Sequence, residues 1–195
     1  MQILKTAGGS IKLAGEKNQL LNPFIILEGL GVGDGKIVAD LGCGGVGYFV
    51  FAASKLVGDH GIVYAVDILK PNLEGIKSRA KSEGIYNIRP VWANLEVLNG
   101  SKIPSNSVDM ALFINILFQT KKYREVLHEA FRIIKPGGLL AVIDWKFTPT
   151  PLGPPPNERV GKDKIKEFAV LSGFTQGEEF EAGKYHYGIK FYKKK

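Results

Sequence analysis

The chain has 195 residues, of which 45% are hydrophobic and 23% are charged. This is the composition of an ordinary globular protein, which excludes a fibrous or disordered chain, and the length favours one domain over residues 1–195. The 26 basic and 19 acidic side chains give a net charge of +7, which permits an anionic partner without requiring one.

The distribution of cysteine, histidine and apolar residues argues against disulfide-linked, metal-binding, membrane-spanning and secreted proteins. Cys43 is the only cysteine and the three histidines are scattered, so we expect neither an internal disulfide nor a metal site. The apolar runs are too short to cross a bilayer, and the first ten residues do not resemble a secretion signal. We therefore expect a cytoplasmic protein with no membrane insertion.

Apolar runs typical of strands alternate with segments of helical periodicity, which predicts a parallel sheet covered by helices. An amphipathic segment within residues 1–30 precedes them as an N-terminal cap. The predicted strands cover residues 36–40, 62–67, 88–92, 108–114 and 139–144. The predicted helices cover residues 47–56, 71–83 and 122–134, the last one stopping at the turn Lys135-Pro136-Gly137-Gly138.

The C-terminal part begins with a proline-rich segment, residues 147–157. It holds five of the ten prolines, and because proline fits neither a helix interior nor a central strand, we expect a stiff, exposed loop. A helix over 162–172 and two strands near 176–181 and 185–192 follow, joined as a hairpin through Ala182-Gly183. The alternation of Tyr185, Tyr187, Ile189 and Phe191 predicts that the last strand lies at an edge of the sheet.

Open parallel sheets bind ligands beyond the carboxyl ends of their strands. The run from Asp40 to Gly47, DLGCGGVG, takes a buried strand into a glycine loop whose backbone can approach a ligand closely. Asp67 ends the next strand 20 residues after Gly47, so the dinucleotide fingerprint is nominally met. Asp40 argues against a dinucleotide, because a carboxylate repels a pyrophosphate but attracts an ammonium or sulfonium group.

Four blocks together resemble the class I S-adenosylmethionine (AdoMet) dependent methyltransferases, of the small single-domain type 11 or type 31 kind. They are the glycine block, VYAVD at 63–67, SVDMAL at 107–112 and IKPGGL at 134–139. The resemblance covers roughly residues 24–145, and the glycine block has one residue more between Gly44 and Gly47 than the family's D-x-G-x-G-x-G.

The resemblance implies an α/β fold: a Rossmann-like, doubly wound, mostly parallel seven-stranded sheet with an antiparallel C-terminal hairpin strand. It also implies AdoMet as the cofactor and methyl transfer by in-line displacement. The Asp67 carboxylate would accept hydrogen bonds from both ribose hydroxyls, Asn94 and Leu95 would flank the adenine, and Asn115 would lie near the reacting methyl. The expected cofactor-binding residues are Asp40, Gly42, Cys43, Gly44, Gly45, Gly47, Asp67, Ile68, Asn94, Leu95 and Asn115.

Several of these residues also have a structural interpretation. Asp40 could cap a helix, Cys43 could fill a small space, and Asn94 and Asn115 could be turn formers. Asp109 is interpreted as structural, and Cys43 is not interpreted as a nucleophile because it lies inside the glycine loop.

The acceptor site is expected between the N-terminal segment, the strand end at Asp144-Trp145 and the proline-rich loop 148–157, which would act as a lid. His186 is a further candidate for this pocket, although its position suggests the surface. The unidentified acceptor is expected to be a small molecule rather than nucleic acid. The sequence after residue 114, Asn115-Ile116-Leu117-Phe118, lacks the Asn-Pro-Pro-aromatic clamp of adenine methyltransferases, and a single cysteine excludes arsenite methylation.

Two other functions stay open from sequence alone. One is an NAD(P)-dependent oxidoreductase on the same kind of sheet, although Tyr123 with Lys121 or Lys122 lacks the spacing of a catalytic Tyr-Lys pair. The other is a non-catalytic AdoMet-fold or RNA-binding protein, suggested by the lysines among the aromatic residues of the tail.

Overall fold

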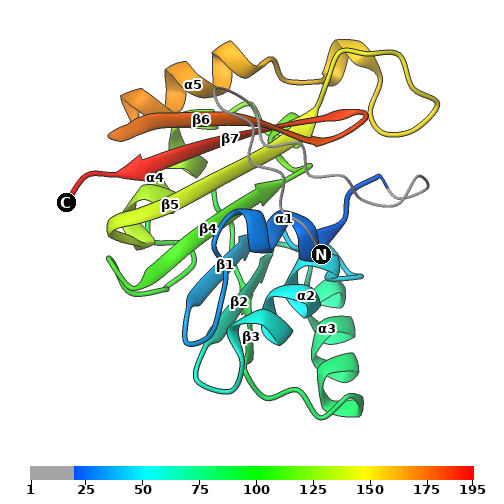
Figure 1. Cartoon of the computed structure of the whole chain (residues 1–195), viewed down its shortest axis with the longest axis vertical. Coiled ribbons are helices and arrows are strands. Elements are labelled where there is room, and N and C mark those ends of the chain that lie inside the picture. Colours follow the sequence, from blue (N-terminus) through cyan, green and yellow to red (C-terminus); the bar gives the residue numbers. More distant parts are fainter. Residues whose placement is uncertain (1–19) are drawn as a thin grey trace, which may run out of the picture.

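The computed structural model describes residues 20–195, so most of the expected N-terminal cap lies outside the described residues. The centre of the molecule is a seven-stranded sheet in the order β3-β2-β1-β4-β5-β7-β6 (Figure 1). Its strands are β1 (Ile37–Leu41), β2 (Ile62–Asp67), β3 (Ile88–Trp92), β4 (Val108–Ile114), β5 (Ile134–Trp145), β6 (Phe174–Gly183) and β7 (His186–Lys193). The α-helices are α1 (Pro23–Gly29), α2 (Tyr48–Val57), α3 (Lys70–Ser82), α4 (Tyr123–Ile133) and α5 (Lys162–Leu171), with short 3₁₀ turns at η1 (Leu117–Gln119) and η2 (Pro156–Glu158).

The pairing of the strands confirms the predicted fold class. Strands β1 to β5 run parallel to one another, whereas β7 pairs antiparallel with both β5 and β6. The chain crosses from one half of the sheet to the other between β3 and β4, so the strand order reverses at the neighbours β1 and β4. The connections leaving their carboxyl ends diverge there, which opens the crevice in which doubly wound sheets bind ligands.

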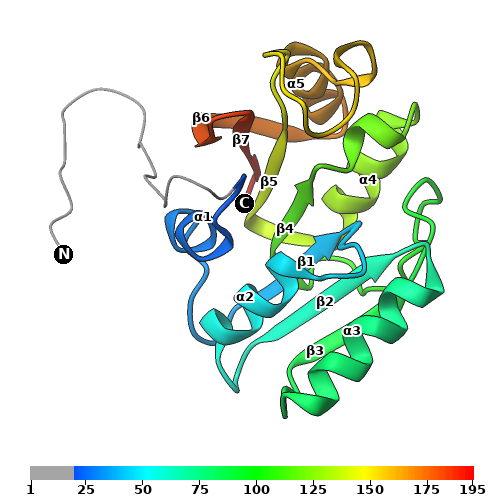
Figure 2. The same cartoon turned by 90° about the vertical axis from the view of Figure 1, so that its right-hand side faces the viewer.

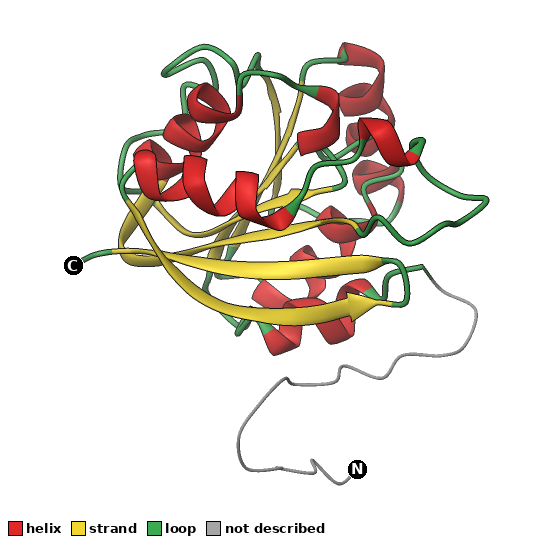
Figure 3. Cartoon of the chain, turned by 90° about the horizontal axis from the view of Figure 1, so that it is seen from above, coloured by secondary structure: helices red, strands yellow, loops and turns green. Residues whose placement is uncertain are grey.

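Helices cover both faces of the sheet (Figures 2 and 3). Helices α1, α2 and α3 contribute buried side chains to the apolar core on one face, and α4 and α5 contribute to the core on the other. In α4, the residues Val126, Leu127, Ala130 and Ile133 recur at the three-and-four spacing that places them on one side of a helix, and all four are buried.

The junction between α4 and β5 corrects a sequence prediction. The turn expected at residues 135–138 is part of β5, which begins at Ile134 directly after the helix. The backbone N–H groups of Asn106 and Ser107 donate to the carbonyls of Arg132 and Ile133, so pairing with the β4 side starts as soon as the helix ends. The proline and glycines are accommodated by an irregular register between the two strands, with Gly137 at a φ of +81°.

The C-terminal hairpin corrects three further sequence predictions. Strand β7 lies between β5 and β6, so β6 and not β7 is the edge strand. The connection is Lys184-Tyr185 rather than Ala182-Gly183, and His186, which was expected at the surface, is fully buried. The reason is that apolar side chains pack on both faces of β7: Ile189 and Phe191 pack on the α4–α5 side, while on the other side Gly188 leaves room for the Phe180 ring.

Candidate functional site

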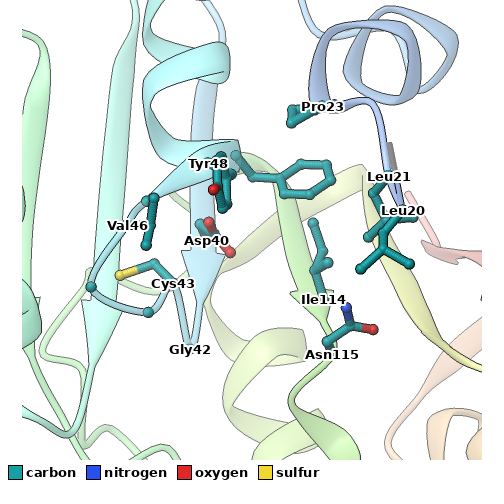
Figure 4. Close-up of a pocket in the computed structure, with 14 residues that line it drawn as sticks. Leu20, Leu21, Pro23, Asp40, Gly42, Cys43, Val46, Tyr48, Ile114 and Asn115 are labelled. Carbon is teal, nitrogen blue, oxygen red and sulfur yellow. The ribbon is translucent and has the colours of Figure 1, made fainter. Parts of the chain in front are cut away.

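Two cavities lie on either side of the loop between β1 and α2. The larger one, about 650 Å³, lies between this loop, the end of β4 and the segment before α1 (Figure 4). The smaller one, about 370 Å³, is reached from the ends of β2 and β3. Gly42 and Gly44 line both cavities, so the glycine loop forms the ridge between them.

All eleven residues predicted for the cofactor line at least one of these cavities. Those in the larger cavity are Asp40, Gly42, Cys43, Gly44, Gly45, Gly47 and Asn115. Those in the smaller cavity are Gly42, Gly44, Asp67, Ile68, Asn94 and Leu95. A single extended ligand crossing the glycine ridge would contact both groups.

Asp67 is held firmly at the end of β2. One carboxylate oxygen accepts a hydrogen bond from the N–H of Leu69 (2.8 Å) and the other accepts one from the N–H of Gly44 (2.9 Å). Each carboxylate oxygen has two lone pairs, so both can still accept a bond from a ligand hydroxyl. The carboxylate therefore fixes the glycine loop and can at the same time bind a diol.

The glycine loop needs glycine for two different reasons. At Gly42 the φ is +86° and a Cβ would meet the Ile116 side chain at 2.6 Å, so packing excludes a larger residue. At Gly44 the φ is +65°, but no atom lies within 4 Å of the position of a Cβ. A side chain at Gly44 would instead enter open space beside the two cavities.

Asp40 lies one residue before the end of β1, beneath this loop, and is almost fully buried. Burial, and secondarily the nearby Asp67 carboxylate, raise the pKa of Asp40 to about 7. Burial also raises the pKa of the Cys43 thiol, with smaller contributions from the two carboxylates, so Cys43 does not supply a thiolate. A cation that enters the larger cavity would stabilise the ionised form of Asp40.

Two asparagines show both of the roles considered for them. The side-chain oxygen of Asn94 accepts a hydrogen bond from the N–H of Glu96, a turn-forming contact, while Asn94 also lines the smaller cavity. Asn115 has a φ of +54° after β4, and its N–H donates to the carbonyl of Ile143. Its side-chain oxygen is buried and has no hydrogen-bond partner among residues 20–195.

Asp109 has the structural role expected of it. Its carboxylate accepts hydrogen bonds from the N–H of Ile37 (2.8 Å) and from Lys135 (2.9 Å), far from both cavities along the sheet. It ties the starts of β1 and β5 to β4.

Of the parts predicted for the acceptor site, the N-terminal segment lines the larger cavity through Leu20, Leu21 and Pro23, whereas Asp144, Trp145, His186 and the loop 148–157 line neither cavity. Asp144 and Trp145 follow one another on β5 and therefore point to opposite faces of the sheet. Asp144 faces the α4–α5 side with Tyr123 and Tyr187, where burial raises its pKa to about 6. Trp145 stacks on His186 on the other face, so the structure separates Asp144 from His186.

Sequence reasoning missed most of the apolar wall of the larger cavity. It consists of Leu20, Leu21, Pro23, Val46, Tyr48, Phe49 and Ile114. Tyr48, which follows the glycine loop directly and is 70% exposed, could have been suspected from its position. Leu20, Leu21 and Pro23 belong to the amphipathic N-terminal segment that was expected to border the acceptor site, although the sequence did not single them out individually.

The model of the ubiE/COQ5 methyltransferase family matches residues 20–152. The chain belongs to this family. AdoMet is accordingly its cofactor, and the site fits this molecule: the Asp67 carboxylate suits a ribose diol, the glycine ridge allows close approach, and the buried Asp40 carboxylate suits a sulfonium or ammonium group.

Individual relatives agree with the family match. The chain is 32% identical over 127 residues to the ubiquinone/menaquinone biosynthesis C-methyltransferase UbiE of Hydrogenovibrio crunogenus, covering 65% of this chain and 48% of the relative. It is 26% identical to the sterol 24-C-methyltransferase ERG6A of Gibberella zeae, covering 76% of this chain and 35% of the relative. The chain thus spans about half or less of the length of these curated relatives.

A solved structure matches over more of its length. The SAM-dependent methyltransferase of Aquifex aeolicus superposes with a TM-score of 0.80 at 28% identity, covering 88% of this chain and 89% of that one. These matches favour a methyltransferase over the oxidoreductase considered above. Within residues 20–195, no helix is both long and apolar enough to cross a membrane.

Proposed function

We propose that this chain transfers the methyl group of AdoMet to a small, uncharged and largely apolar acceptor held in the larger cavity. The class of acceptor is inferred from the charge and polarity of the residues that line that cavity. Among the described residues that line it, Asp40 is the only charged side chain, and it is an acid. Apart from the charges of the cofactor itself, an acceptor bearing a phosphate or carboxylate would find no cationic side chain there, and burying its charge would cost free energy.

The cofactor would cross the glycine ridge. Its adenosine part would occupy the smaller cavity, with the ribose on Asp67 and the adenine beside Asn94 and Leu95. Its methionine part would reach the larger cavity beside Asp40 and Asn115. When bound, AdoMet supplies an electrophilic methyl group on a sulfonium.

The protein's own contribution is to hold the acceptor in line with that methyl group. Alignment alone can account for much of the acceleration of such a displacement, because it removes the entropic cost of bringing two molecules together. The names of the relatives support an apolar acceptor, since one methylates in ubiquinone and menaquinone biosynthesis and another methylates a sterol.

The first test is the cofactor. Asp67→Ala is expected to weaken AdoMet binding by roughly 1.5–3 kcal/mol, or about 10- to 150-fold, since hydrogen bonds to a charged group are lost. Calorimetric titration of both proteins measures this. The matched control is Asp34→Ala, which removes a carboxylate whose side chain is 77% exposed and should leave the affinity unchanged. Unaltered affinity in a folded Asp67→Ala protein would contradict the ribose assignment.

The second test is the acceptor class. Methyl-labelled AdoMet is incubated with the protein and with separate lipid-soluble, water-soluble, protein and RNA fractions of a cell extract. We expect label in the lipid-soluble fraction, because this fraction holds uncharged apolar molecules. Label confined to RNA or protein would refute the proposed acceptor and favour a macromolecular substrate.

A further inference from the structure

Trp145 and His186 form a buried pair that the cofactor site does not use. They are register partners on β5 and β7, and their ring centroids lie 4.1 Å apart at an angle of 45°. His186 is fully buried, yet neither of its ring nitrogens has a hydrogen-bond partner among residues 20–195. Burying an imidazole without partners costs free energy, so such a group is expected to have a partner in a functional state.

The surroundings of His186 keep its ring neutral. Burial lowers its pKa to about 4, and the positive charges of Lys146 and Arg159 act in the same direction. A neutral imidazole has one nitrogen that donates and one that accepts, so it can bind a hydroxyl or a carbonyl. A cationic ligand would be repelled by the same two neighbours.

The pair lies next to the larger cavity on the same face of the sheet. Leu20 and Leu21 line that cavity, and on their other side they pack against Gly183, where a Cβ would lie 2.6 Å from the Leu20 carbonyl oxygen. Gly183 is the register partner of His186 across the hairpin. Leu20 and Leu21 therefore connect the wall of the cavity to the end of the hairpin at which His186 lies.

The ends of three neighbouring strands set the distance between Asn115 and His186. Asn115, at the end of β4, bonds to β5, and β5 pairs with β7 at His186. Two strand spacings, about 10 Å, separate Asn115 from His186 across the sheet. A fused-ring molecule with polar groups at its two ends matches this span.

The proline-rich loop closes the far side of the pair. At Gly153 a Cβ would lie 2.6 Å from the Trp145 ring, so the loop backbone rests on the indole. The buried Arg159 guanidinium holds the loop by donating to the carbonyls of Lys146 (2.6 Å), Thr148 (2.8 Å) and Pro154 (2.9 Å). The loop is thus a fixed wall behind Trp145.

We propose that Trp145 and His186 form a second subsite of the acceptor site, reached when Leu20 and Leu21 move aside. In it, the ring system of the acceptor contacts Trp145, and a hydroxyl or carbonyl at its distal end hydrogen-bonds to His186. His186 is a positioning residue, remote from the transferred methyl. This inference rests on the proposed methyl transfer to an apolar acceptor.

The test uses two probes that differ by one hydroxyl, 2,6-dihydroxynaphthalene and 2-naphthol. Their binding is titrated calorimetrically in the presence of S-adenosylhomocysteine, so no turnover is needed. We expect the dihydroxy probe to bind the unaltered chain at least tenfold more tightly. His186→Phe should remove this preference and leave 2-naphthol binding unchanged, while His186→Gln, which keeps a donor and an acceptor, should restore part of it.

The control variant is His128→Phe, the same substitution at an exposed position on α4, which should keep the preference. A melting temperature of His186→Phe at or above that of the unaltered chain shows that the fold is retained. Equal affinities for the two probes, no binding of either, or a preference that survives His186→Phe would overturn the subsite. Failure of S-adenosylhomocysteine to bind would instead contradict the proposed function.

Discussion

Burial and a second carboxylate both disfavour the ionised form of Asp40. With a pKa of about 7 in the folded protein and about 3.8 when unfolded, it binds more protons in the folded state across that interval. Folding stability therefore falls as the pH rises from about 4 to about 7. A cationic ligand reverses this preference, because it stabilises the carboxylate.

Asp40→Asn is expected to be more stable than the unaltered chain and to bind AdoMet more weakly. The gain in melting temperature should grow from about pH 4 to about pH 7 and level off above that, since over this interval the Asp40 carboxyl of the unaltered chain releases its proton on unfolding, whereas an asparagine has none to release. The affinity of the unaltered chain for AdoMet should rise over the same range, relative to the variant. Thermal melts and calorimetry at several pH values check this, and parallel profiles for the two proteins would contradict it.

Single residues show what the sequence could and could not predict about the site. Asp40 and Asp67 were predictable because each ends an apolar strand at the edge where ligands bind. Asp144 ends a strand too, but the two-residue alternation that buries Trp145 on one face turns Asp144 to the other. Whether His186 is buried depended on which strand lies beside β7, which no local pattern specifies.

At the scale of elements, the glycine loop between β1 and α2 allows the effect of backbone strain to be distinguished from the effect of lost ligand contact, by comparing a glycine in the loop with a glycine outside it. Gly44 and Gly84 have nearly the same φ, +65° and +67°, and at neither would a Cβ have an atom within 4 Å. Gly84 lies between α3 and β3, and among the cavities described above it lines none. Gly44 and Gly84 are thus matched in backbone conformation and in free space, and they differ in whether they line a cavity.

Gly44→Val and Gly84→Val should each lose about 1–2 kcal/mol of stability, because both force a β-branched residue into the left-handed region. Only Gly44→Val should abolish AdoMet binding, because its side chain enters the space beside the ridge. Denaturant unfolding and calorimetric titration of both variants measure the two effects. AdoMet binding that is retained in Gly44→Val, or lost equally in both, would show that close backbone approach is not the function of this glycine.

The elements differ in how well local sequence predicted them. The bounds of β2, β3 and β4 were predicted correctly. Strands β2 and β4 are short, mostly apolar runs between polar or glycine-containing segments, whereas β3 is a weaker pattern that also contains Arg89 and Pro90. The start of β5 was wrong because Pro136 and Gly137 have the local chemistry of a turn, whereas hydrogen bonds from residues 106 and 107, distant in sequence, decide the pairing. The interior position of β7 was missed for the same reason: periodicity identifies a strand without identifying its neighbours.

At the scale of the whole molecule, the cofactor and the acceptor depend on different parts of the chain. In the proposed function the glycine loop and the ends of β1 to β3 bind AdoMet, whereas the loop after β5 rests on Trp145. Replacing residues 148–157 by a glycine-serine linker of equal length should therefore change AdoMet affinity by less than about threefold. It should remove most of the methyl transfer, because the wall behind Trp145 is lost.

This replacement is checked by calorimetry with AdoMet and by label transfer to the lipid-soluble fraction. Turnover that survives the replacement would show that the loop plays no part in acceptor binding. Loss of AdoMet affinity together with turnover would place the loop's role at the cofactor, and the acceptor wall would then have to be formed by the segment before α1.

The interior position of β7 also affects how the chain folds during synthesis. A nascent chain that has emerged only as far as β6 lacks the strand that separates β6 from β5 in the native sheet. Its β5 then presents an unpaired edge, the kind of surface through which chains associate with one another. The last of the seven strands must emerge from the ribosome before this edge is covered, so β5 stays open to such association until β7 is available.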